Sequence, residues 1–317
     1  MRSLRPDDET PAQRSRGGRL GQFLVGGPKK ARRATAAPSC KEDRSGDRER
    51  HWRSIHVRAN WMGRMVLEEK TTLAGWLARA PFALTMSSGF FSFYAHTGFL
   101  TALEDAGLLP TRVSGSSAGA LVGAAWAAGV DAPRLADELE RLERRDFWDP
   151  GIGAGLLRGR LFRERMEGLI SARTFEACRV PAAVSVFDVV TRKTRVLDGG
   201  EVAPAICASC AVPVLFQPVR IGGRSYLDGG ILDRPGLAGM PASEPRVLYH
   251  HIASRSPWRT KLEMPSRPGM LTLAIDGLPR SGPFRLHEGR RAYRAARDAT
   301  KRALERPVTD SVVGVSA

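Results

Sequence analysis

The segment Gly115-x-Ser117-x-Gly119 is the part of the sequence best suited to chemistry. A β-prone run at 111–114 precedes it, and a helix-forming run at 118–128 follows it. In a strand–turn–helix of this kind the glycines let the two backbones approach closely, and the serine hydroxyl stands clear of the sheet. The N-terminus of the following helix favours negative charge that develops beside it. We therefore expect Ser117 to be a nucleophile, with Gly115 and Gly119 as the glycines of its turn.

A serine nucleophile requires a base that accepts its proton. Asp228 ends a β-prone run at 225–228 and precedes Gly229-Gly230, so a tight turn would leave its carboxylate at the mouth of a sheet. Burial there would raise the pKa of the carboxylate enough for it to act as a general base. We expect Asp228 to be the base that serves Ser117.

Three histidines and a second aspartate are the other candidates for the base. His250, His251 and His287 follow Ser117 in the chain, but the sequence around them lacks the signature expected of the histidine in a Ser-His-Asp hydrolase. Asp198 also precedes two glycines. It follows a charged hairpin and precedes a helix, so it suits a surface turn and a helix cap better than a catalytic position.

The segment 87–92 follows the first predicted strand, 82–86, and is expected to supply donors for the oxyanion. Its small residues expose backbone N–H groups, and Gly89 and Phe90 are the best donors by position. The backbone N–H of Ala118, at the start of the helix after the nucleophile, completes the set. Taken alone, the segment is equally consistent with an ordinary turn between a strand and a helix.

Strands and helices alternate along the chain, which predicts a parallel sheet joined by right-handed crossovers. An apolar, glycine-rich loop at 147–157 is either a lid or lipid-contacting surface, or simply a connection. The basic C-terminal helix could contact anionic lipid or pack on the surface through its alanines. The predicted helices span 71–80, 98–106, 118–128, 132–144, 161–171, 201–210 and 285–306, and the predicted strands span 82–86, 111–114, 181–190, 194–197, 225–228 and 247–252.

The composition is that of a globular enzyme: 317 residues, of which 42% are hydrophobic, can bury a full core. No uninterrupted apolar run of about 18 residues is present, and the N-terminal region contains no signal-peptide core. Four cysteines in so long a chain indicate a reducing compartment. Cys207-x-x-Cys210 has no second pair to complete a metal site. We therefore expect a cytoplasmic protein with peripheral contact at the membrane, and neither a metal nor a cofactor.

The net charge of +16 is concentrated near the N-terminus, where residues 1–64 hold sixteen Lys/Arg and seven Asp/Glu. Low hydrophobicity with high charge predicts a disordered extension over 1–64, followed by a single domain over 65–317. A basic arm could bind nucleic acid or an anionic membrane. Because no aromatic residues alternate with the basic ones, we favour an unstructured extension and do not expect a nucleic-acid partner.

Four segments follow one another in the order and spacing of a known family: 88–98, 115–119, 208–218 and 226–230. Through them, residues 82–306 resemble the patatin-like phospholipases. The resemblance implies a three-layer α/β/α sandwich with a mainly parallel central sheet. It also implies a dyad of Ser117 and Asp228 that hydrolyses acyl esters of phospholipids or other lipids without a histidine, a metal or a cofactor.

The segment 88–92 departs from the family pattern, in which several glycines are followed by Arg or Lys. Here it holds one glycine, two phenylalanines and no basic residue. Backbone donors do not require glycine, so we expect an active enzyme, although loss of one donor would cost about 10²–10³ in rate. The alternative is a weak or inactive patatin-like protein that binds lipid or serves in regulation.

Overall fold

The structure, a computed structural model, describes residues 71–252 and 264–317. The predicted extension over 1–64 and the predicted start of the domain at 65 lie outside the described residues and stay predictions. Within the described residues, no helix is both long enough and apolar enough to cross a bilayer.

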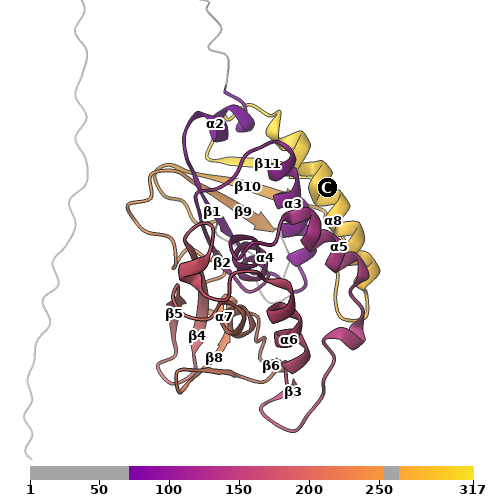
Figure 1. Cartoon of the computed structure of the whole chain (residues 1–317). Coiled ribbons are helices and arrows are strands. Elements are labelled where there is room, and N and C mark those ends of the chain that lie inside the picture. The colour runs from indigo at the N-terminus through magenta and orange to yellow at the C-terminus, as the bar shows by residue number, and fades with distance from the viewer. Residues whose placement is uncertain (1–70, 253–263) are drawn as a thin grey trace, which may run out of the picture. The chain divides into compact units, whose positions relative to one another are not determined.

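A nine-stranded sheet runs through the described part of the chain in the order β11-β10-β9-β1-β2-β4-β8-β7, with β5 beside β4 (Figure 1). Neighbours from β11 to β4 pair in parallel, whereas β5, β8 and β7 are antiparallel to the strands beside them. The sheet is therefore mixed, with a parallel majority as predicted. Its strands are β1 (Ala83–Met86), β2 (Arg112–Ser116), β4 (Ala182–Asp188), β5 (Lys193–Leu197), β7 (Val219–Ile221), β8 (Arg224–Asp228), β9 (Val247–Ile252), β10 (Met270–Asp276) and β11 (Val312–Ser316).

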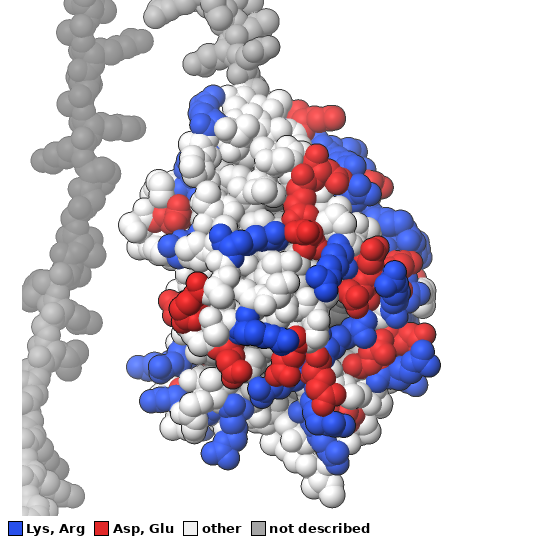
Figure 2. Space-filling view, in the orientation of Figure 1, with Lys and Arg blue, Asp and Glu red and all other residues white. Residues whose placement is uncertain are grey.

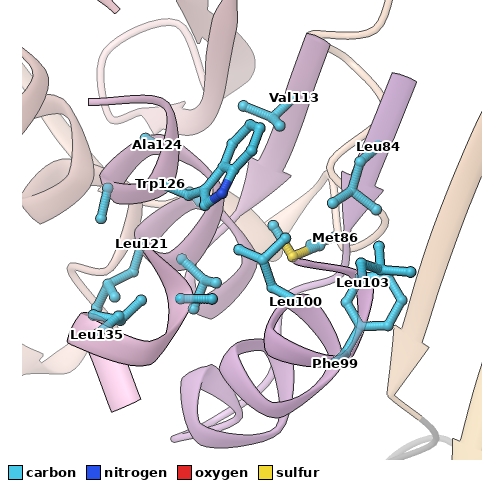
Figure 3. Packing of buried hydrophobic residues seen from close by; sticks show 14 of the residues in the cluster. Leu84, Met86, Phe99, Leu100, Leu103, Val113, Leu121, Ala124, Trp126 and Leu135 are labelled. Carbon is cyan, nitrogen blue, oxygen red and sulfur yellow. The ribbon is translucent and has the colours of Figure 1, made fainter. Parts of the chain in front are cut away.

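Helices pack on one face of this sheet (Figure 1). Successive strand residues point to opposite faces, and those on this side enter one large apolar core. Figure 3 shows Leu84, Met86 and Val113 of the sheet among Phe99, Leu100 and Leu103 of α3 and Leu121 and Trp126 of α4. The helices of this layer are α3 (Phe93–Asp105), α4 (Ala118–Ala127), α5 (Ala132–Arg141), α7 (Val202–Ser209) and α8 (Leu286–Leu304).

The opposite face of the sheet carries a second, smaller apolar cluster. Ala83 of β1 and Tyr249 of β9 point to this side, where Leu237 and Met240 pack against them. Both of these partners come from the segment between β8 and β9. The layered α/β fold expected from the sequence is thus present, with an apolar core on each side of the sheet.

The basic helix α8 packs through small residues. Gly98 of α3 lets the two helices come close, because a Cβ at that position would overlap the carbonyl oxygen of Tyr293. The buried alanines of α8 recur at three- and four-residue spacing, as expected for one face of a helix: Ala292, Ala296, Ala299 and Ala303. This is the surface helix packing through alanines that the sequence offered as one of two interpretations.

Several elements differ from those predicted. Helix α3 begins at Phe93, five residues before the predicted start, because burial of Tyr94 (1% exposed) outweighs the weak helix propensity of aromatic residues. Helix α5 ends at Arg141 rather than at 144. Strands β7, β10 and β11 were not predicted. The loop predicted at 147–157 ends in β3 (Gly155–Leu157), which pairs with an unpredicted strand, β6 (Val214–Phe216).

Candidate active site

Ser117 occupies the sharp turn between β2 and α4. Its φ of 51° and ψ of −118° lie outside the regions that serine ordinarily adopts, so the turn is strained. Two glycines make the turn feasible. A Cβ on Gly115 would overlap the backbone of Gly119, and a Cβ on Gly119 would overlap the carbonyl oxygen of Met86. Gly115 and Gly119 therefore lie where the backbones of β2, α4 and β1 come closest to one another.

Strand β4 brings Asp228 to Ser117 across 111 residues of sequence. One edge of β4 pairs with β5 over 184–188. The other edge pairs first with β2, as far as Ser185, and then with β8, where Val186 faces Asp228. Because β2 is parallel to β4 and β8 is antiparallel to it, the C-terminal ends of β2 and β8 meet head to head.

The two side chains are joined by a hydrogen bond. Ser117 Oγ donates to Asp228 Oδ2 at 2.7 Å, and the backbone N–H of Gly230 donates to Asp228 Oδ1 at 2.7 Å. The serine is 8% exposed and the aspartate 6% exposed. Burial raises the pKa of Asp228 from 3.8 to about 6, against the lowering effect of the two hydrogen bonds. At neutral pH the carboxylate is ionised and is a stronger base than an aspartate in water.

Ser209, to which the sequence assigned no role, fixes the backbone at Ser117. Its Oγ accepts a hydrogen bond from the N–H of Ser117 at 2.9 Å and donates one to the carbonyl of Ser185 at 2.7 Å. Cys210 beside it donates from Sγ to the carbonyl of Ser117 at 3.3 Å. Burial raises the pKa of the Cys210 thiol well above its ordinary value, so this group stays protonated. The only sequence signal for Ser209 was its place in the segment 208–218.

The segment expected to supply oxyanion donors adjoins Ser117. Gly89 and Phe90 line the same cavity as Ser117 and Ala118. Within the described residues, the N–H groups of Gly89 and Phe90 donate to no backbone carbonyl. Phe91 has a φ of 55°, in the left-handed region that non-glycine residues rarely adopt. The segment is therefore held in a strained conformation that leaves two donors unoccupied.

The alternative bases are engaged elsewhere. His250 is fully buried, and its Nδ1 lies 2.9 Å from Nδ1 of His96. Burial lowers the pKa of both rings, to about 3 for His96, so the pair is neutral. His251 contacts a tyrosine hydroxyl at 2.9 Å, His287 is exposed, and Asp198 is exposed after β5. Among the described residues, none of these side chains has a hydrogen bond to the serine–aspartate pair.

Beside Ser117 an apolar cavity extends toward α5 and α6 (Arg160–Leu169). The charged side chains in its lining, Glu138 and Arg165, form an ion pair with each other at 3.1 Å. Such a lining favours a hydrocarbon chain over a polar group. Most of the wall consists of aromatic and aliphatic side chains, including Phe91, Phe147, Phe162, Phe216, Leu139 and Met166.

Known proteins are similar to this chain in sequence and in fold. Residues 84–239 match the family model of the patatin-like phospholipases. An uncharacterized NTE family protein of Mycobacterium tuberculosis is 32% identical over 154 residues, which is 48% of this chain and 43% of that protein. A second NTE family protein of the same organism is 32% identical over 165 residues, which is 51% of this chain and 28% of that protein. The chain thus spans less than half the length of these relatives.

Among solved structures, VipD from Legionella pneumophila has a similar fold. It superposes with a TM-score of 0.51 at 16% sequence identity, over 71% of this chain and 66% of that chain. At this identity the likeness concerns the fold, and it agrees with the α/β sandwich described above. Over residues 84–239 the chain therefore matches the patatin-like phospholipase family, in agreement with its sequence motifs and its relatives.

Proposed function

We propose that this chain hydrolyses acyl esters of lipids, phospholipids among them, with Ser117 as nucleophile and Asp228 as base. One observation carries this proposal. The Ser117 hydroxyl donates to a buried carboxylate at 2.7 Å and opens on an apolar cavity. A hydroxyl, a base and an acyl-binding wall are the three components that ester hydrolysis through an acyl-enzyme requires.

In the first step, Ser117 Oγ attacks the ester carbonyl carbon while Asp228 Oδ2 accepts the hydroxyl proton. The carbonyl electron pair moves onto oxygen, where donation from the backbone N–H groups of Gly89, Phe90 and Ala118 would stabilise it. When the carbonyl re-forms, the alcohol leaves with the proton from Asp228. The acyl group is then an ester of Ser117. In the second step Asp228 accepts a proton from water, which attacks this ester, and Asp228 returns the proton to Ser117 Oγ as the bond to the acyl group breaks and the fatty acid is released.

The raised pKa of Asp228 explains why the mechanism does without histidine. A pKa of about 6 is close to the ordinary value of about 6.5 for imidazole. The buried carboxylate is therefore nearly as basic as an ordinary imidazole, and most of it is ionised at neutral pH.

A second candidate function is lipid binding without hydrolysis. It is favoured by the two phenylalanines in the oxyanion segment, since Phe90 is 55% exposed and Phe91 has a φ of 55°. If this strained segment does not hold the oxyanion, the cavity would still bind an acyl chain. The two candidates differ in whether Ser117 reacts.

The test is labelling of the purified full chain with a fluorophosphonate, which reacts only with an activated serine. We expect the wild type to be labelled, Ser117→Ala to be unlabelled, and Asp228→Asn to be labelled at least about 100-fold more slowly. Ser116→Ala is the matched control. The Oγ of this neighbouring buried serine has no hydrogen-bond partner among the described residues, so labelling should be retained. An unlabelled but folded wild type would favour the lipid-binding protein, and labelling of Ser117→Ala would refute the nucleophile.

A further inference from the structure

The two-stranded sheet of β3 and β6 exposes apolar side chains that the proposed chemistry does not use. Ile152, in the turn before β3, is completely exposed, Val214 is 82% exposed and Leu156 is 48% exposed. The two segments that form this projection, 150–157 and 211–219, contain no charged residue. Neighbouring apolar side chains held in water mark a contact surface more often than single ones do.

The backbone holds these side chains outward. Val214 has a φ of 70°, a conformation that is strained for a β-branched residue. It is kept there by pairing with Gly155 across the two strands. The side-chain amide of Gln217 donates to the carbonyl of Ile152 at 3.1 Å, which ties the turn to β6. Backbone strain and the exposure of apolar surface both oppose this arrangement. The strand pairing and the hydrogen bond therefore hold the apolar side chains outward at a cost in stability.

The same small sheet forms part of the cavity wall beside the nucleophile. Leu215 and Phe216 of β6 line the cavity that contains Ser117. Val214, their neighbour in the same strand, points to solvent. A surface that covers Val214 would therefore lie directly beside the cavity.

Basic side chains flank the projection. Arg158 and Arg160 follow β3, Arg220 follows the uncharged segment that contains β6, and all three are exposed. Asp149, the acidic residue just before the projection in the sequence, is engaged, because its carboxylate accepts from the backbone N–H groups of 159–161 and caps α6. Arg160 also forms an ion pair with Glu164 at 3.1 Å on the surface of α6. Figure 2 shows Lys and Arg side chains around the lower end of the molecule, where Figure 1 places β3 and β6.

We propose that Ile152, Leu156 and Val214 form a docking surface that inserts into an anionic lipid membrane while the flanking arginines contact the headgroups. Apolar side chains ringed by Arg are the combination that binds such an interface. Docking in this way would bring lipid to the mouth of the cavity. It needs no reaction at Ser117, so it can hold even if the proposed hydrolysis does not.

The test compares two leucines of similar exposure. Leu156 is 48% exposed on the docking surface, and Leu109 is 53% exposed in the connection before β2, at the other end of that strand from Ser117. Leu156→Ser, Leu109→Ser and the double variant Ile152→Ser/Val214→Ser are made in the full chain carrying Ser117→Ala, so that lipid is not consumed. Binding is measured by co-sedimentation with phosphatidylglycerol–phosphatidylcholine vesicles and with phosphatidylcholine vesicles.

We expect Leu156→Ser to weaken binding to the anionic vesicles about tenfold, the double variant to weaken it more, and Leu109→Ser to leave it unchanged. Equal binding by all variants, or an equal loss in Leu156→Ser and Leu109→Ser, would overturn the proposal. So would unchanged vesicle binding with an altered oligomeric state, which would identify a protein interface. Binding to phosphatidylcholine as strong as to anionic lipid would overturn the role of the arginines.

The same substitutions in the chain with Ser117 intact control for folding. Hydrolysis of a water-soluble acetyl ester should then equal that of the parent protein. A variant that loses vesicle binding but keeps this hydrolysis supports docking. If the parent protein itself hydrolyses no ester, that result counts against the proposed dyad and leaves the docking proposal unaffected.

Discussion

Asp228→Asn is expected to abolish hydrolysis and, at neutral pH, to make the fold more stable than the wild type. Asp228, the proposed base, is 6% exposed, and its carboxylate has one hydroxyl and one backbone N–H as its donors. These two hydrogen bonds do not repay the loss of water around the charge, which is why the pKa rises to about 6. Asparagine fills the same space without a charge.

The size of the effect follows from proton binding. In the unfolded chain Asp228 releases its proton near 3.8, and in the fold it retains the proton up to about 6. Between these values the folded state binds more protons, so the free energy of unfolding of the wild type falls as pH rises. A shift of about two pKa units corresponds to about 3 kcal/mol. The stability of Asp228→Asn relative to the wild type should therefore increase by about 3 kcal/mol between about pH 3.5 and about pH 7.5.

Urea unfolding of both proteins, followed by circular dichroism across this pH range, measures the difference directly. Any constant offset from the asparagine amide cancels, because only the change with pH is compared. Asp198→Asn is the control, because it removes a carboxylate that is exposed to solvent and is therefore not desolvated by folding. A stability difference that stays constant with pH would refute a buried, ionised Asp228. In the same range, kcat/KM of the wild type should rise with pH and level off above about 6, as the base loses its proton.

Two further predictions concern the turn and the cavity. Gly115→Ala should lower the free energy of unfolding by about 2–3 kcal/mol, because its Cβ would overlap the backbone of Gly119. Gly168→Ala, in α6 with no atom within 4 Å of the added Cβ, should instead raise the free energy of unfolding by about 0.5–1 kcal/mol. Urea denaturation of both variants measures these changes, and a change of the same sign and size in both would contradict this account. Leu139→Trp narrows the cavity and should reduce kcat/KM for a long-chain ester at least about tenfold while leaving an acetyl ester nearly unchanged. An equal loss for both esters would show that Leu139 does not contact the acyl chain.

Local pattern was sufficient to predict the turn that carries Ser117. The glycine spacing reflects two backbones in contact, and that requirement is visible in five consecutive residues. Strand β9 matched its predicted bounds, 247–252, and all six of its residues are buried, two histidines among them. Both Asp228 and Asp198 precede two glycines, so the choice of Asp228 depended on context, since Asp198 follows a charged hairpin and precedes a helix, together with the family resemblance.

Other features depend on contacts that no short segment contains. Strand β11 alternates exposed and buried residues in the structure, but its sequence Val-Val-Gly-Val-Ser shows no alternation of apolar and polar types. The start of α3 depends on burial of Tyr94 in the core. The role of Ser209 arises only when α7 is packed beside the nucleophile, which gives its hydroxyl both a donor and an acceptor.

The antiparallel strand β8 is the feature that brings the dyad within hydrogen-bond reach. In a purely parallel sheet, Asp228 would lie at the C-terminal edge on a separate strand beside β2. In the structure, β8 instead continues along the same edge of β4 to which β2 pairs. Ser116 and Asp228 therefore face consecutive residues of β4, Ser185 and Val186. Consecutive strand residues are about 3.3 Å apart along the strand. At that separation a carboxylate reaches the serine hydroxyl directly, and no imidazole is needed to bridge them. The departure from a purely parallel sheet therefore allows an aspartate to serve as the proposed base.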